Sequence, residues 1–335
     1  MNSKERLDAY ISGNKVDRRP NLTIVGSVVT QYTGIGIDTY CKDYKAMTEA
    51  AVMAARDLKL DYVQIASDLS REAEGYGSVL EYKKDGLPVV ARYALDDITK
   101  VSGLKAKKAS DIARMYDLAK AVELANQIEG EIYPMTLSVG PATVAANIRG
   151  VQELLMDMFD EPEACQELFE KVNETILDNI HMLAQAGAKY IYVADPVASL
   201  VSPASYHEFI QPLHTRIYSE MVGLGITGRL HMCGDTEKIL PYSLQTGAKI
   251  IDIDHVVDFK KALELCKGRC IINGNIDPVE EVFSCTSQHT KEAIISCAKK
   301  VSYARAMFMP GCELPTRTPL ENVKAIYEAL VEIGE

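Results

Sequence analysis

The stretch Ala186–Pro203 reads AGAKYIYVADPVASLVSP, and it decides the fold. Its apolar run Tyr190–Asp195 is short and rich in aromatic and β-branched residues, which is typical of a buried strand. A long amphipathic pattern, Glu161–Ala186, precedes the run, and Gly187 is the kind of residue that ends a helix. A second helical pattern, Pro203–Val222, follows the run. Helix, strand and helix in this order indicate a parallel sheet with helical crossovers.

Runs of this kind recur along the chain, and helical patterns separate them. The apolar runs are Leu22–Val28, Tyr62–Asp68, Tyr133–Gly140, Tyr190–Asp195, Gly228–Gly234, Ile250–Asp254, Cys270–Asn275 and Ala306–Cys312. The helical patterns are Asp43–Leu58, Ser110–Ile128, Glu161–Ala186, Pro203–Val222, Thr236–Gln245, Phe259–Cys266, Ser287–Val301 and Pro319–Ile333. This alternation predicts an α/β protein with the (β/α)8 TIM-barrel fold. A doubly wound open sheet is the alternative, but the sequence has no G-x-G-x-x-G loop after its first strand.

One segment departs from the alternation. Ser78–Tyr93 holds two alternating runs around Asp85-Gly86, which is a turn signal of a β-hairpin. Because the segment follows the second strand, we expect a hairpin excursion at the mouth of the barrel. The chain shows no internal repeat or linker, so we expect a single domain over residues 1–335.

Composition narrows the class of protein. The chain has 335 residues, 47% hydrophobic and 25% charged, which is enough for a large core. Its net charge of −11 argues against a nucleic-acid partner. No apolar run reaches the roughly 18 residues of a membrane span, and the N-terminal MNSKERLDAY has no apolar signal segment. We therefore expect a cytoplasmic protein whose eight cysteines stay reduced.

Polar residues follow most of the expected strands, at the end of a TIM barrel that carries the active site. They are Asp68, Glu72, Glu74, Asn147, Asp195, His231, Cys233, Asp254, His255, Asn275, Asp277, Cys312 and Glu313. His231, Cys233 and Cys312 come from two strand ends that face one mouth. Three protein ligands with a fourth position left for substrate is the arrangement of catalytic zinc. On the residues alone, a buried histidine with two core cysteines remains the alternative.

Other candidates carry competing interpretations. Cys266 and Cys270 are spaced C-x-x-x-C, but they fall at a helix end and a strand start, which favours burial in the core. Asp195 precedes a proline, so it is suited equally to capping a turn and to orienting a substrate. His255 follows a strand end, where a loop role and a site role are both open.

Taken together, these segments resemble the uroporphyrinogen decarboxylase superfamily, and within it the zinc-dependent cobamide methyltransferase branch. The matching stretches are RRP at Arg18–Pro20, SDLSREAEGYG at Ser67–Gly77, VGPATVAANIRG at Val139–Gly150, Ala186–Pro203, HMCGDTEKIL at His231–Leu240, GNIDP at Gly274–Pro278 and GCELPTRTPLENVKA at Gly311–Ala325. The decarboxylase itself binds its porphyrinogen with an arginine-rich stretch after R-x-P. Here NLTIVGSVVTQYTG follows Pro20 without a basic residue. The H-x-C pair with a distant cysteine is the zinc signature of the methyltransferase branch.

The resemblance implies a zinc-dependent methyltransferase with His231, Cys233 and Cys312 as metal ligands, and Asp254 or Glu313 as a possible fourth. It implies methyl transfer between a small zinc-bound substrate and the cobalt of a corrinoid carried by a partner protein. Our first choice is transfer from methyl-Co(III) to a thiol such as coenzyme M. The alternative direction takes methyl from an ether, amine or thioether to Co(I). A metal-independent decarboxylase-type enzyme is the second alternative.

Further residues receive roles under this interpretation. We expect Asp195, Glu72 and Asn275 to act in catalysis by orienting the substrate or moving a proton. Those expected to bind substrate are Arg149 and Arg317 for the sulfonate of coenzyme M, and Tyr192 and Phe308 for an aromatic methyl ether. A corrinoid-binding subunit without catalytic activity is a further alternative, but the chain has no D-x-H-x-x-G loop for the cofactor.

Overall fold

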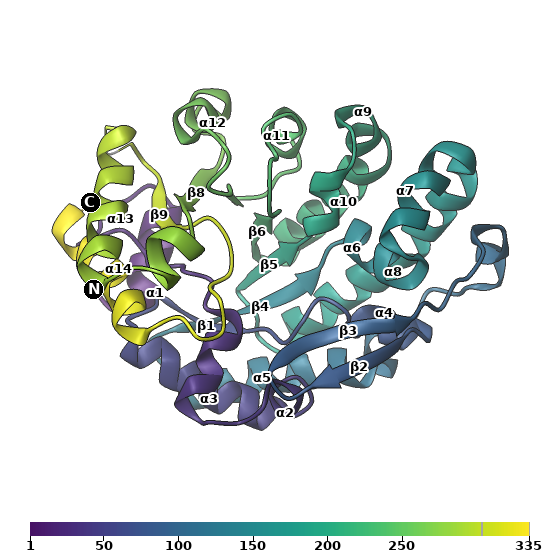
Figure 1. Cartoon of the computed structure of the whole chain (residues 1–335), viewed down its shortest axis with the longest axis horizontal. Coiled ribbons are helices and arrows are strands. Elements are labelled where there is room, and N and C mark those ends of the chain that lie inside the picture. Colours follow the sequence, from purple (N-terminus) through teal and green to yellow (C-terminus); the bar gives the residue numbers. More distant parts are fainter. Residues whose placement is uncertain (303, 335) are drawn as a thin grey trace.

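A curled parallel sheet forms the centre of the molecule (Figure 1). The computed structural model describes residues 1–302 and 304–334. The strands of this sheet are β1 (Tyr62–Ile65), β4 (Tyr133–Val139), β5 (Tyr190–Ala194), β6 (Thr227–His231), β7 (Ile250–Asp252), β8 (Ile271–Ile276) and β9 (Met307–Pro310). They follow one another in the order β1-β4-β5-β6-β7-β8-β9, and every neighbouring pair is parallel. The expected α/β barrel architecture is confirmed, with one change in its strand count.

The first expected strand, Leu22–Val28, is not a strand, and that expectation was wrong. The backbone amides of this segment bond to a side chain and not to a neighbouring strand. Gln64 Oε1 accepts the amides of Val25 (2.9 Å) and of the following residue (3.1 Å). On the other side, the amide of Leu314, which follows β9, donates to the carbonyl of Ile24. These bonds tie the segment to both ends of the sheet, so it fills the eighth barrel position without strand geometry.

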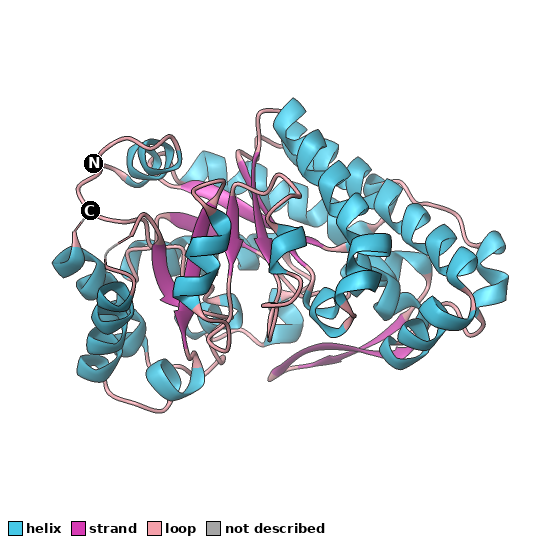
Figure 2. Ribbon diagram, turned by 90° about the horizontal axis from the view of Figure 1, so that it is seen from above, coloured by secondary structure: helices cyan, strands magenta, loops and turns pink. Residues whose placement is uncertain are grey.

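Helices surround the strands (Figure 2). They are α1 (Ser3–Ile11), α2 (Ile37–Tyr40), α3 (Tyr44–Asp57), α4 (Arg71–Tyr76), α5 (Ala113–Ile128), α6 (Pro141–Arg149), α7 (Val151–Asp160), α8 (Pro162–Gln185), α9 (Pro203–Ser205), α10 (Gln211–Gly223), α11 (Leu240–Ser243), α12 (Phe259–Cys266), α13 (Ser287–Lys300) and α14 (Leu320–Ile333). Shorter 3-10 turns are η1 (Gly26–Tyr32), η2 (Ile98–Gly103), η3 (Ala109–Asp111) and η4 (Pro196–Leu200), and π turns are η5 (Tyr206–Ile210) and η6 (Val279–Phe283). Among the described residues, no helix is both long and apolar enough to cross a membrane.

Helix boundaries follow local chemistry. Gly187 adopts φ +90 just after α8, as expected of a residue that ends a helix. The expected helix Thr236–Gln245 was too long, since only α11 forms there. Pro241 has no amide hydrogen and fits only the first turn of a helix, so it cannot lie in the interior of the longer one.

The hairpin is present as a separate two-stranded sheet. β2 (Val79–Lys83) pairs antiparallel with β3 (Gly86–Arg92). It falls between β1 and β4 in the sequence and is not paired with the barrel strands (Figure 1). Its residue Leu87 nevertheless reaches the site described below.

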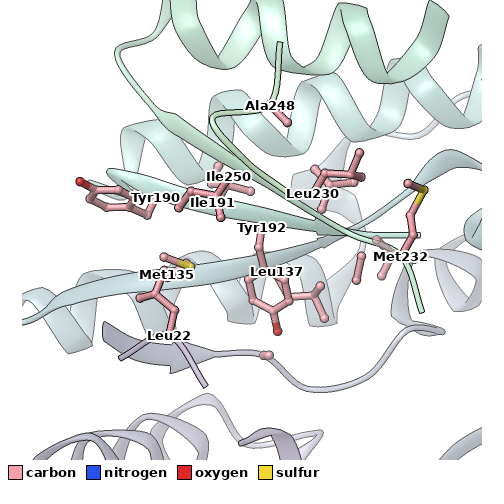
Figure 3. Close-up of a cluster of buried hydrophobic side chains, with 14 of the residues drawn as sticks. Leu22, Met135, Leu137, Tyr190, Ile191, Tyr192, Leu230, Met232, Ala248 and Ile250 are labelled. Carbon is pink, nitrogen blue, oxygen red and sulfur yellow. The ribbon is translucent and has the colours of Figure 1, made fainter. Parts of the chain in front are cut away.

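Apolar side chains from neighbouring strands pack together in the core. Figure 3 shows Met135, Leu137, Ile191, Leu230 and Ile250 packed in this cluster, and each is at most 4% exposed. Parallel strands covered on both faces need such nearly continuous apolar runs. Buried charged residues within the strands are therefore exceptions that call for a partner or a function.

Candidate metal centre

Three side chains meet at the carboxyl edge of the sheet. His231 is the last residue of β6, Cys233 lies two residues beyond it, and Cys312 lies two residues beyond β9. His231 Nε2 lies 3.2 Å from the Sγ of Cys233 and 3.7 Å from the Sγ of Cys312, and the two sulfurs are 3.0 Å apart. Among the described residues, these three form the only group of three or more potential ligands of this kind. The barrel fold thus brings together residues that lie far apart in the sequence.

A buried carboxylate orients the histidine. Asp252 Oδ2 lies 3.0 Å from His231 Nδ1, so it holds a proton on that nitrogen and turns Nε2 toward the thiols. Asp252 is held in turn by Arg229 Nε (2.9 Å to each oxygen) and by Asn273 Nδ2 (2.8 Å). Asp252 and its two partners, Arg229 and Asn273, are each at most 1% exposed. A carboxylate behind a histidine is the usual support of a metal ligand.

The chemistry of the three donors suits a soft cation, which would displace the protons that they carry. Burial lowers the pKa of His231, but hydrogen bonds to Asp252 and Cys312 outweigh it and raise that pKa to about 10. The hydrogen bond from Cys233 lowers the pKa of Cys312 to about 5, while the same contact raises the pKa of Cys233. Two sulfurs and one imidazole nitrogen, with one sulfur already inclined to be a thiolate, are the donor set that suits zinc. The residues present therefore fit a zinc ion.

A cavity of about 90 Å³ opens onto these ligands. Its apolar wall consists of Ile24, Leu69, Leu87, Leu137, Tyr192 and Pro196. Its polar groups, apart from the three ligands, are Gln64, Ser67, Asp68 and Glu313. Of the described residues that line it, none is a lysine or an arginine. The cavity is small, largely apolar and adjacent to the three donors.

The two carboxylates expected as a fourth ligand lie close by but have other partners. Glu313 Oε1 accepts the amide of Ser27 at 3.2 Å, and burial raises the pKa of Glu313 to about 7. Gly26 leaves the room for this carboxylate, since a Cβ there would lie 1.8 Å from Oε1. Asp254 accepts the amide of Gly234 at 2.6 Å. Neither carboxylate joins the group of three donors, and their role as a fourth ligand stays a prediction.

The three residues expected in catalysis do not line this cavity. Asp195 is fully buried and accepts the amides of Ala142 (3.2 Å) and Thr143 (2.7 Å), and it contacts His214 Nε2 at 3.0 Å. It thereby ties the start of α6 to the end of β5. Its catalytic role stays a prediction, and the geometry indicates a structural one.

Glu72 and Asn275 are placed in a similar way. Glu72 Oε1 accepts the amide of Val139 at 3.3 Å and a bond from Arg71, while its other oxygen is buried without a partner. The Asn275 amide donates to the carbonyls of Asp254 and Val257. It faces a separate hollow of about 480 Å³, which His255 and Asp277 also line. Their catalytic roles also stay predictions.

Of the four residues expected to bind substrate, only one lines the cavity. Tyr192 lines the cavity, and its hydroxyl accepts a bond from Gln64 at 3.2 Å. Phe308 is fully buried and packs edge-on against Phe259 outside the cavity. Arg149 is paired with Asp157 at 2.7 Å, and Arg317 is exposed. Neither arginine lines the cavity.

Three residues of the site were not predicted from the sequence: Asp252, Arg229 and Leu87. A signal was available for the first two, because each is a charge inside an apolar run of a strand, and the two runs are neighbours in a parallel sheet. Leu87 carried no such signal, since its position at the mouth depends on how the hairpin folds over it.

A parallel α/β barrel with a His/Cys/Cys cluster at its carboxyl edge is the architecture of a barrel enzyme with a candidate metal site. The family model for uroporphyrinogen decarboxylase (URO-D) matches residues 2–333, and the chain belongs to this enzyme family.

Named relatives cover nearly the whole chain. The chain is 27% identical over 342 residues to a methylated-thiol--coenzyme M methyltransferase of Methanosarcina mazei, covering 99% of this chain and 90% of the relative. It is 25% identical to the methylcobamide:CoM methyltransferase MtbA of Methanosarcina acetivorans, with 97% and 96% covered. A uroporphyrinogen decarboxylase of Carboxydothermus hydrogenoformans is 23% identical, with 88% and 85% covered. A solved methyltransferase structure from Methanosarcina mazei shares the fold with a TM-score of 0.90 at 21% identity, with 99% of each chain covered.

Proposed function

We propose that this protein is a zinc-dependent methyltransferase that moves a methyl group between the cobalt of a corrinoid, held by a partner protein, and the sulfur of a small thiol. The observation that carries the proposal is the meeting of His231, Cys233 and Cys312 beside a small apolar cavity. Relatives named as methylcobamide:CoM methyltransferases support the corrinoid as co-substrate.

Zinc at this centre would lower the pKa of a bound thiol, so that a thiolate is present near neutral pH. The residues of the chain supply the rest. Asp252 fixes the ring of His231, and the apolar wall with Leu137 and Tyr192 keeps water away from the reacting sulfur. The sulfur attacks the methyl carbon, a C–S bond forms, the Co–C bond breaks with its electron pair left on Co(I), and the thiol proton goes to solvent. Such an in-line displacement requires the alignment that a rigid barrel mouth provides.

The direction from methyl-Co(III) to a thiol, of which coenzyme M is the example in the relatives' names, is our first candidate. The reverse direction, from an ether, amine or thioether to Co(I), would use the same groups. A metal-independent decarboxylase is the weaker alternative, because a cavity of about 90 Å³ is far smaller than a tetrapyrrole.

The test is spectroscopic. The zinc-loaded protein is mixed with methylcobalamin and a panel of thiols, and the loss of the methyl-Co(III) absorption is followed. The reverse assay uses Co(I) cobalamin with methyl ethers, amines and thioethers. We expect the thiol panel to respond. If neither assay shows a change in corrinoid absorption while zinc is bound, the proposal of methyl transfer is contradicted.

A further inference from the structure

We infer that the thiol taken by this site is small and uncharged, and that Leu87 of the β2–β3 hairpin sets this limit. The inference rests on the proposed function and narrows its substrate class. It follows from the size of the cavity, from the charges on its wall and from the origin of Leu87 outside the barrel.

The cavity bounds the part of the substrate that can be buried beside the three donors. It measures about 90 Å³ next to the three donors. A cavity of roughly 150 Å³ in another protein holds one benzene molecule, so this one suits a molecule of about four non-hydrogen atoms. Methanethiol and ethanethiol are of this size. Coenzyme M, 2-mercaptoethanesulfonate, exceeds ethanethiol by a whole sulfonate group.

The wall of the cavity disfavours an anion. Besides the three donors, its ionisable groups are the carboxyls of Asp68 and Glu313, and the described lining residues include no lysine or arginine. The cation nearest to Asp68 is Arg114, and this guanidinium already pairs with Asp68 and with Glu74 (2.8 Å). A sulfonate here would be removed from water without a counter-ion, which is costly. Apart from the metal ligands, the described lining residues offer no positively charged side chain, whatever the protonation of the two carboxyls.

Leu87 is the lining residue that comes from the hairpin. It lies in β3, at the turn end of a two-stranded sheet that is not paired with the barrel strands. Its side chain is partly exposed while it also contributes to the cavity wall, so it stands between the cavity and solvent. A change at this position alters the size and charge of the entrance without touching the barrel core or the metal ligands.

The test measures binding, not turnover. Cobalt(II) replaces zinc in the purified protein, and the thiolate-to-cobalt absorption band gives the dissociation constants of ethanethiol and 2-mercaptoethanesulfonate. We expect ethanethiol to bind at least about tenfold more tightly than the sulfonate thiol, a difference of about 1.4 kcal/mol. Leu87→Lys should shrink or reverse this preference, and Leu87→Ala should admit butanethiol. The matched control is Val79→Lys on the same hairpin, an exposed position that does not line the cavity and should leave both constants unchanged.

The outcomes separate this inference from the proposed function. Equal or tighter binding of the sulfonate thiol by the unchanged protein overturns the inference, while methyl transfer to that thiol would leave the proposed function intact. An unaltered preference in both Leu87 variants overturns the role of Leu87. Failure to bind cobalt or zinc at all would overturn the proposed function itself.

Discussion

Two pairs of cysteines in this molecule look alike in distance and differ in everything else. The sulfurs of Cys233 and Cys312 are 3.0 Å apart, and those of Cys266 and Cys270 are 3.3 Å apart. The first pair has His231 Nε2 within 3.7 Å and lines a cavity. The second pair is at most 7% exposed and bonds to its own backbone at the end of α12. Two close thiols are thus not a metal site, because a third donor from another strand and an open face are also needed.

Removing one of the three proposed ligands should have the largest effect on zinc affinity. It would therefore test the difference between the two cysteine pairs most sharply. Cys312→Ser is expected to lower zinc affinity by more than about 100-fold, since loss of a ligand should exceed loss of a supporting group. Methyl transfer should fall with it. Zinc affinity is measured by competition with a chelator of known strength. Cys270→Ser is the matched control, and loss of zinc in that variant would break the comparison.

Removing the support behind His231 should have the next largest effect. Asp252→Asn keeps the shape of the side chain but removes its charge, and we expect zinc affinity to fall by about 10- to 100-fold. Asp61→Asn is the matched control, because Asp61 is equally buried and is also held by guanidinium groups, from Arg6 (2.7 Å) and Arg18 (2.6 Å).

The Asp61→Asn control separates the effect of Asp252 on the orientation of His231 from its effect on the stability of the fold. Asp61→Asn should destabilise the fold yet leave zinc affinity in the folded protein unchanged. Equal zinc affinities in the two variants would show that Asp252 acts only through the fold.

Asp195 should behave as a structural residue. Asp195→Asn leaves one of its hydrogen-bond partners at α6 or His214 unsatisfied, and we expect a loss of about 1–3 kcal/mol in the free energy of unfolding. Zinc affinity and the methyl-transfer rate should stay nearly unchanged. Denaturant unfolding and the methylcobalamin assay check both parts. A large fall in the rate with stability retained would restore the catalytic role expected from the sequence.

The buried pair of Cys266 and Cys270 should affect the pH dependence of stability and leave zinc binding unchanged. The hydrogen bond from the Cys270 thiol lowers the pKa of Cys266 to about 6 from its usual 9. Between these values the unfolded chain holds a proton that the folded chain lacks, so stability should rise with pH from 6 to 9 and fall as pH drops through 6. Cys266→Ala should flatten this slope, measured by denaturant unfolding with zinc bound. An unchanged slope would show that Cys266 is protonated throughout.

Periodicity predicted most of the fold, because buried parallel strands and amphipathic helices leave plain patterns. The prediction failed at Leu22–Val28, where the side chain of Gln64 accepts backbone amides that would otherwise bond to a neighbouring strand. The pattern of apolar residues carries no information about such side-chain bonds. His231, Cys233 and Cys312 were predictable because they follow strand ends of one barrel. Asp195 also follows a strand end, yet its side chain turns to α6. The position of a residue in a strand determines at which end of the barrel it lies. The packing around the residue determines where its side chain points.

The proposed zinc centre is tested most directly by X-ray absorption on the protein incubated with zinc, together with metal analysis. The account predicts about one zinc ion per chain, with two sulfur ligands, one imidazole nitrogen and one light atom in the first coordination shell. On addition of ethanethiol the shell should change to three sulfurs and one nitrogen. A protein that holds no zinc, or zinc with no sulfur in its shell, would contradict the account.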